Sequence, residues 1–275
     1  MTFELLVSCV KKDPHELASQ MHIASDAVIV SQKEETDSTE EFELNGNRIK
    51  VIRQNNKGVG LSRNTCLENS TADVILFGDE DIVYDDGYME KVIAEFNAHP
   101  EADILLFNVR VCEERRTYWN DSYHKVGRYN CGRYPAYSIA ARSSALKMSG
   151  VKYSLLFGGG AKYSNGEDSL FLMDCIKKGL RVFADTAVLG EEVPRPSTWF
   201  FGYTDKFFYD RGVLYTFLYG QAAWLWGIRW LLKMQSQYSK NYTFKEAKKM
   251  LFLGISEGDS GVSSFDKNGK IILAK

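Results

Sequence analysis

Three consecutive acidic residues, Asp79, Glu80 and Asp81, follow a short apolar segment and Gly78. Carboxylates crowded together repel one another unless a cation lies among them. Asp79 and Asp81 are two positions apart, so in an extended chain their side chains point to the same side. This Asp-x-Asp arrangement suits a hard divalent ion, Mg²⁺ or Mn²⁺, that also binds substrate phosphates. The alternative is a polar surface loop with solvated acids.

A second acidic pair, Glu167 and Asp168, follows Asn165-Gly166 and opens a predicted helix that ends near Gly179. Acids in a first helical turn are commonly no more than partners of the helix dipole. These residues alone therefore leave a chemical role open.

The elements that must position these acids alternate between short apolar strands and helices, which predicts an α/β fold with a mostly parallel, Rossmann-like sheet flanked by helices. We expect residues 33–47 to form a surface loop, residues 110–134 to be irregular, and Glu191-Glu192 to lie in a turn. The expected strands are 3–10, 27–30, 49–52, 73–77, 103–109, 136–141 and 181–184, and the expected helices are 14–21, 61–69, 88–96, 143–148 and 167–178.

Polar residues end the first strands, at Ser8, Gln32, Gln54 and Asp79. In open α/β sheets ligands bind beyond the carboxyl ends of the strands, so we expect these side chains to converge.

A glycine-containing turn with Gly58 and Gly60 leads into the helix that carries Ser62 and Arg63. Such a turn lets the backbone approach a ligand closely, and a helix N-terminus favours anions. Arg63 could reach a phosphate or brace the acidic loop. A tight connection without a ligand is the alternative.

The composition is that of a globular protein: 275 residues, 44% hydrophobic and 25% charged. A formal net charge of −2 gives no electrostatic case for nucleic acid. Five cysteines without regular spacing indicate a reducing compartment. The sequence shows neither a signal-peptide pattern nor a stretch of about 20 apolar residues, and we expect a cytoplasmic protein.

The region after residue 200 changes character. The stretch Gly212–Ile228 is uncharged and rich in aromatic residues, and a second helix is predicted over Thr243–Phe252. This stretch either packs on the main domain or on a second subunit, or lies at the inner face of a membrane, where Trp and Tyr are favoured. Basic residues nearby suit anionic headgroups: Arg229, Lys233, Lys245, Lys248 and Lys249.

These motifs resemble glycosyltransferase family 2 of the GT-A fold, especially the bacterial members that build capsular or lipopolysaccharide chains. The resemblance rests on Gly58-x-Gly60-Leu61-Ser62-Arg63-Asn64, then a strand and Asp79-Glu80-Asp81-Ile82-Val83-Tyr84, then Asn165-Gly166-Glu167-Asp168 before a helix. It implies a GT-A domain over residues 1–200 and leaves residues 201–275 as a C-terminal helical extension.

The resemblance also implies the chemistry of a hexosyltransferase. It predicts transfer from a nucleotide-diphosphate donor, a UDP-sugar, to a glycan or lipid-linked acceptor, with Mn²⁺ or Mg²⁺ and inversion at the anomeric carbon. In family terms Asp81 binds the metal, Asp79 touches the metal and the donor, and Asp168 deprotonates the acceptor with Glu167 beside it. Glu191 stands near the place of a histidine ligand of relatives. The predicted donor-binding residues are Ser8, Gln32, Gly58, Ser62, Arg63, Asp79 and Glu80.

Two other functions compete with this one. Sugar-phosphate nucleotidyltransferases also bind nucleotides on an α/β fold. That class is typified by a Gly-rich, Arg-containing loop after the first strand, whereas this chain has Ser8 to Lys12 at that place. A nucleotide- or glycan-binding module without catalysis is the non-enzymatic alternative, against which both acidic motifs argue.

Overall fold

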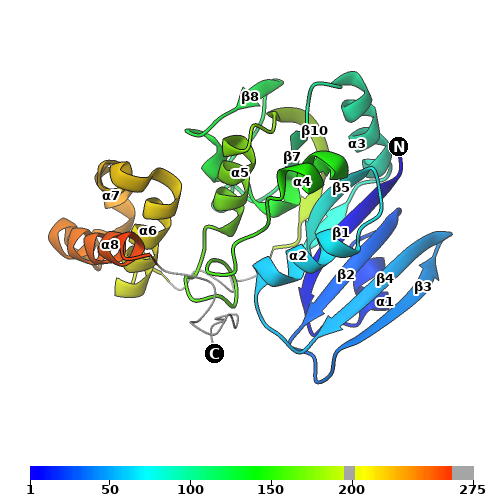
Figure 1. Cartoon of the computed structure of the whole chain (residues 1–275), viewed down its shortest axis with the longest axis horizontal. Helices are drawn as coiled ribbons and strands as arrows, with labels where there is room; N and C mark the ends of the chain where they lie inside the picture. Colours follow the sequence, from blue (N-terminus) through cyan, green and yellow to red (C-terminus); the bar gives the residue numbers. More distant parts are fainter. Residues whose placement is uncertain (195–201, 262–275) are drawn as a thin grey trace.

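The computed structural model describes residues 1–194 and 202–261. Its centre is a ten-stranded sheet in the order β3-β4-β2-β1-β5-β9-β7-β10-β6, with β8 paired to β10 (Figure 1). The strands are β1 (Phe3–Val10), β2 (Asp26–Gln32), β3 (Ser38–Leu44), β4 (Asn47–Gln54), β5 (Val74–Asp79), β6 (Ile82–Tyr84), β7 (Ile104–Arg110), β8 (His124–Val126), β9 (Ile139–Arg142) and β10 (Val182–Glu192). The helices are α1 (Pro14–Gln20), α2 (Val59–Asn69), α3 (Tyr88–Ala98), α4 (Ser143–Ser149), α5 (Glu167–Lys177), α6 (Asp205–Tyr219), α7 (Ala223–Tyr238) and α8 (Phe244–Asp259).

The predicted α/β fold with a mostly parallel sheet is confirmed. β4, β2, β1 and β5 are parallel neighbours, and β7 is parallel to β10. The antiparallel additions are β3, β6, β8 and β9. Successive residues of β1 belong to two different hydrophobic core clusters. Leu5 and Val7 lie in the cluster on one face of the sheet, and Leu6 lies in the cluster on the other. Burial on both faces explains why the central strands are apolar without alternation.

Two predictions about loops were wrong. Residues 33–47 contain β3, which forms a hairpin with β4. The turn between them is Asn45-Gly46, and both residues have positive φ, 54° and 83°, as a two-residue hairpin turn requires. Glu191 and Glu192 lie in β10 rather than in a turn, because β6 pairs with the end of that strand.

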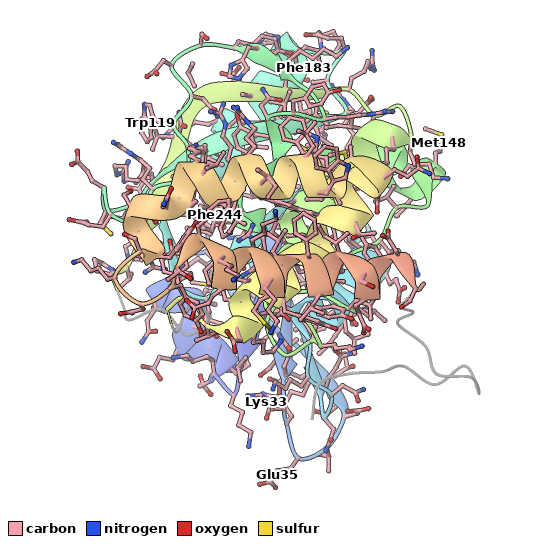
Figure 2. The ribbon with its side chains drawn as sticks, turned by 90° about the vertical axis from the view of Figure 1, so that its left-hand side faces the viewer. Lys33, Glu35, Trp119, Met148, Phe183 and Phe244 are labelled. Atoms are coloured by element: carbon pink, nitrogen blue, oxygen red, sulfur yellow. The ribbon has the colours of Figure 1, made fainter. Side chains whose placement is uncertain are left out.

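The aromatic tail forms helices instead of one continuous apolar segment. α6 ends at Gly220, where the chain turns into α7. α6 and α8 pack closely because two glycines face each other: a Cβ on Gly212 would lie 2.0 Å from Leu251 O, and one on Gly254 would lie 1.9 Å from Tyr209 O. α7 and α8 lie side by side across the outer face (Figure 2).

α6 also contacts the loop before α5. A Cβ on Gly166 would lie 2.5 Å from the Leu214 side chain, and buried Asp210 accepts a hydrogen bond from Ser164 N at 2.9 Å. The extension therefore packs against the segment that carries Glu167 and Asp168. The predicted boundary between residues 200 and 201 lies outside the described residues, as do residues 262–275 of the predicted extension. No described helix has the length and apolar character needed to cross a membrane.

Candidate active site

The first acidic loop begins at the carboxyl end of β5. Asp79 is the last residue of this strand and pairs in register with Ser8 of β1. Val10, two residues on, pairs with Gln32 of β2, and Gln32 pairs with Gln54 of β4. The polar residues at these strand ends thus lie along one edge of the sheet, as their positions in the sequence indicate.

Arg63 connects the two acidic motifs. Its Nη2 donates to Asp79 Oδ1 at 2.9 Å, and its Nη1 donates to Asp168 Oδ1 at 2.7 Å and lies 3.4 Å from Glu167 Oε1. The guanidinium lies over the ring of Tyr153, 5.2 Å from its centroid, and only 4% of the side chain is exposed. A buried guanidinium with carboxylates on both amino nitrogens fixes their relative positions. In this structure Arg63 braces the acids, one of its two predicted roles.

Asp168 is held at the start of α5 in a poorly solvated position. Burial raises the pKa of its carboxyl to about 8, and the negative charges of Glu167 and Asp79 act in the same direction. Arg63 and the hydrogen bond from Ala136 N, 3.1 Å long, favour the ionised form and oppose this effect. A carboxylate with a pKa near the working pH is well suited to general-base catalysis.

The predicted donor-binding residues around the glycine turn hydrogen-bond to one another. Gln32 Oε1 accepts from Gly58 N at 2.8 Å, and the fully buried Ser62 donates from Oγ to Ser8 Oγ at 2.9 Å. Through this hydrogen bond the buried Ser62 holds the Ser8 side chain in place. A Cβ on Gly60 would lie 2.3 Å from Ser154 O, so this glycine serves close backbone packing.

The other acids of the loop are tied to neighbouring strands. Glu80 Oε2 accepts a hydrogen bond from Val10 N at 3.0 Å, which fixes Glu80 to the end of β1. The Asp81 carbonyl accepts from Val193 N at 2.8 Å, which draws the end of β10 toward the loop.

β10 places its two glutamates differently. Glu191 lies 3.5 Å from Arg110 Nε and its side chain is 61% exposed. Glu192 is buried, with an ion pair to Arg115. Burial raises the pKa of Tyr137, and the negative charges of Glu192, Asp79 and Asp81 act in the same direction. The sequence offered Glu191 and not Glu192 as a possible ligand, and the strand register that turns adjacent glutamates to opposite faces is not visible in a sequence.

The sequence model of the family described as Glycosyl transferase family 2 matches residues 15–153. The chain belongs to glycosyl transferase family 2. The predicted family and the predicted activity, a glycosyltransferase, are thereby confirmed.

Solved structures similar to this family 2 chain include S. aureus TarS. The complex of TarS 1–349 with UDP-GlcNAc has a TM-score of 0.65 at 15% identity, over 96% of this chain and 82% of that chain. The UDP complex gives 0.61 at 15% identity, over 96% and 84%. At this identity the likeness shows the fold, and it agrees with the predicted GT-A architecture. No curated protein matches the sequence significantly.

The carboxylates of this family 2 chain fit a divalent cation in chemical terms. Asp79, Asp81 and Glu192 supply oxygen ligands, which hard cations prefer. The negative charges of Asp79 and Asp81 add to the burial that raises the pKa of Tyr84, whose buried hydroxyl has no hydrogen-bond partner among the described residues. The only three possible ligands among the described residues whose ligand atoms all lie within 4.8 Å of one another are instead Glu95, His99 and Asp185, toward the other end of β10.

A cavity of about 290 Å³ is lined in part by the glycine loop that packs on Glu167. It lies between the Gly158–Gly160 loop and the start of α6, and it includes Lys57 and Lys206. A Cβ on Gly158 would lie 2.7 Å from the carboxyl carbon of Glu167, so this loop packs directly on the acid pair. The Gly158–Gly160 loop therefore lies between this cavity and Glu167.

Proposed function

We propose that this family 2 enzyme transfers a sugar from a nucleotide-diphosphate donor, a UDP-sugar, to a glycan or lipid-linked acceptor in bacterial surface-polysaccharide synthesis. We further propose that the reaction inverts the anomeric carbon and depends on Mg²⁺ or Mn²⁺.

One observation carries this proposal: Arg63 joins Asp79 at the end of β5 to Asp168 at the start of α5. A transferase needs charge stabilisation for its leaving group and a base for its acceptor. The bridge brings an acid for each of these tasks into one site.

Asp168 is the proposed base. It takes the proton of the acceptor hydroxyl while the acceptor oxygen forms a bond to the anomeric carbon, and the bond from that carbon to the diphosphate breaks. The nucleoside diphosphate then leaves with the bonding electrons. Arg63 and Ala136 N orient the carboxylate through its two oxygens, each of which retains a lone pair. General-base catalysis of this kind contributes about 10²–10⁴-fold to the rate.

Asp81, Asp79 and Glu192 are the residues that would hold a metal ion, and Glu191, on the same strand, is a further candidate from the sequence. A divalent cation bound there would offset the charge that develops on the diphosphate. Arg63 pairs with Asp79 and lowers the repulsion among these acids in the absence of an ion.

The donor and acceptor assignments have separate support. TarS, which shares the fold, has been crystallised with UDP-GlcNAc and with UDP, which favours a UDP-sugar donor here. The cavity beside Gly158 supports an acceptor route toward the acid pair.

The outer face of α7 and α8 supports a location at the cytoplasmic face of a membrane. It exposes large apolar side chains, Trp224, Leu225, Leu232, Phe252 and Leu253, near basic Arg229 and Lys233. Trp226 and Trp230, which the sequence placed with Trp224, instead pack against Tyr219 and Tyr215. A second subunit on the same face is the rival occupant.

The experiment is a panel of nucleotide sugars incubated with the intact protein, with and without Mn²⁺, while release of the nucleotide is measured. We expect slow, metal-dependent hydrolysis of one UDP-sugar, abolished by Asp81→Asn. Asp168→Asn should keep donor binding in calorimetry and lose transfer once an acceptor is found. Asp174→Asn, on the same helix, is the matched control and should behave as the parent protein. Binding without turnover for every donor would favour the non-catalytic module, and turnover unchanged by Asp81→Asn would refute the metal assignment.

A further inference from the structure

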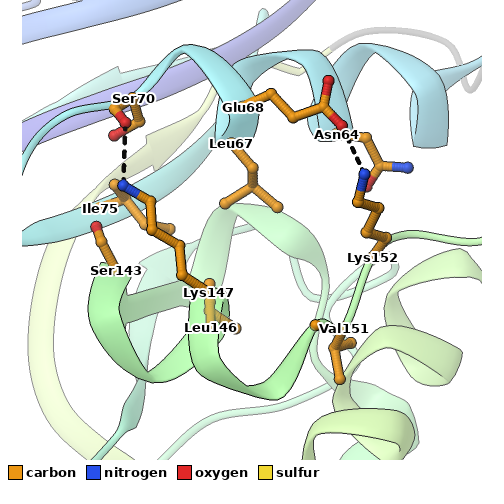
Figure 3. A pocket seen from close by; sticks show the side chains of 11 residues that line it. Asn64, Leu67, Glu68, Ser70, Ile75, Ser143, Leu146, Lys147, Val151 and Lys152 are labelled. Carbon is orange, nitrogen blue, oxygen red and sulfur yellow. Dashed lines mark hydrogen bonds and ion pairs between the residues drawn. The ribbon is translucent and has the colours of Figure 1, made fainter.

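A pocket between α2 and α4, separate from the acid site, has the features of a ligand site. It lies between α2 and α4 and has a volume of about 240 Å³ (Figure 3). Its walls are apolar, formed by Leu67, Ile75, Leu146 and Val151. Pockets for small ligands are mostly apolar with a few placed polar groups, and this volume is just below the drug-sized range of about 300–1,000 Å³.

Two hydroxyl groups at one end of the pocket lack hydrogen bonds. Ser70 and Ser143 are 5% and 7% exposed, and neither Oγ has a partner among the described residues. Ser143 lies beside Ile75 at the pocket's inner end, below Ser70 (Figure 3). A buried hydroxyl without a hydrogen-bond partner is unfavourable. Two such groups lining one pocket indicate that water or a ligand completes them.

A cation lies at the same end. Lys147 reaches from α4 across the pocket, and its Nζ is 3.5 Å from the Ser70 carbonyl oxygen (Figure 3). At the other end Lys152 is already neutralised by Glu68, at 2.7 Å. The excess positive charge therefore lies next to the two hydroxyls. Hydroxyl donors beside an ammonium group are suited to an anion.

We propose that this pocket binds a small amphiphile, with its alkyl chain against Leu67, Leu146 and Val151 and its anionic head at Ser70, Ser143 and Lys147. The proposal does not depend on the sugar-transfer reaction, because none of these residues belongs to the acid site.

The pocket shares a wall with the candidate active site. Asn64, which lines the pocket, donates from Nδ2 to Tyr153 O at 2.9 Å and accepts from Tyr153 N at 2.8 Å. The Tyr153 ring lies under Arg63. An occupant between α2 and α4 therefore contacts Asn64. Asn64 positions Tyr153, whose ring lies against the guanidinium of Arg63.

The test uses the full-length protein and three probes of equal chain length: octanoate, octyl phosphate and neutral octanol, each below its micelle concentration. Isothermal titration calorimetry should show saturable one-to-one binding of an anionic probe and weaker binding of octanol. Lys147→Glu should weaken anion binding at least about tenfold, since it replaces a charged donor with a like charge at the anionic head. The exposed Lys178→Glu is the matched control and should bind as the parent does.

A second variant, Leu146→Phe, should reduce binding of every probe by filling the pocket, and circular dichroism checks its fold. The result with octanoate against octyl phosphate distinguishes a carboxylate from a phosphate head. Equal affinity for octanol and octanoate would overturn the anionic class. Absence of saturable binding, or binding unchanged in both variants, would overturn the site and leave water as the partner of the two hydroxyls.

Discussion

Replacing Arg63 with Met tests the central feature of this structure. The change removes the only cation within ion-pair distance of Asp79, Asp168 and Glu167 among the described residues, while an unbranched side chain keeps much of the packing on Tyr153. Removing one partner of a buried ion pair costs about 3–5 kcal/mol, because the other charge stays buried without compensation. We expect a loss of this size in the free energy of unfolding near pH 8.

The matched control is Arg53→Met. Arg53 makes an ion pair of the same kind with Glu40, at 2.7 Å, but both side chains are partly solvated. Exposed pairs contribute about 0–1 kcal/mol. Urea denaturation of both variants, followed by circular dichroism, gives the comparison. Equal losses in the two variants would refute the idea that the buried bridge organises the site.

The pH dependence gives a second measurement on the same variant. The folded-state pKa of Asp168, about 8, lies above the ordinary value of 3.8. Protonation of this group therefore favours folding: its contribution to stability is complete below pH 3.8 and is lost as the pH rises through about 8. Without Arg63 the ionised form is less favoured still. Parent and variant should therefore lose stability alike up to about pH 8, and only the variant should continue to lose it above about pH 8, where Asp168 of the parent is already ionised. Asp168→Asn added to the variant should recover part of this loss.

Three further predictions concern the pH profile of the reaction, the packing at Gly60 and the exposed side chains of α7. The kcat/KM of sugar transfer should rise with pH through the pKa of Asp168, about 8, because the base must be ionised; a flat profile would remove Asp168 from this role. Gly60→Ala should destabilise the protein by about 1–3 kcal/mol in urea, since overpacking forces the backbone apart, whereas Gly127→Ala, where a Cβ meets nothing within 4 Å, should cost much less. Trp224→Ser with Leu232→Ser, 54% and 58% exposed, should weaken sedimentation with anionic vesicles without unfolding the protein; unchanged sedimentation would favour a protein partner on that face.

Much of the fold could be predicted from the sequence because its signals are local. Pro14 after Asp13 marked the start of α1, and Asp13 indeed caps this helix. The apolar run before Asp79 predicted a buried strand. The hairpin at Asn45-Gly46 also had a local signal, an Asn-Gly pair beside residues that alternate between apolar and polar. The acidic composition of the segment obscured the strand β3.

The sequence by itself determined which side chains could do chemistry: the acids of both motifs, the glycine turn and Arg63. The tertiary structure decided which of them meet. Whether Arg63 points to a phosphate or to the acids depends on the fold, which brings the end of β5 and the start of α5 to Arg63 of α2 from distant parts of the chain. Likewise, the choice between Glu191 and Glu192 depends on the register of β10 against β6, since a shift of one residue turns every side chain to the other face.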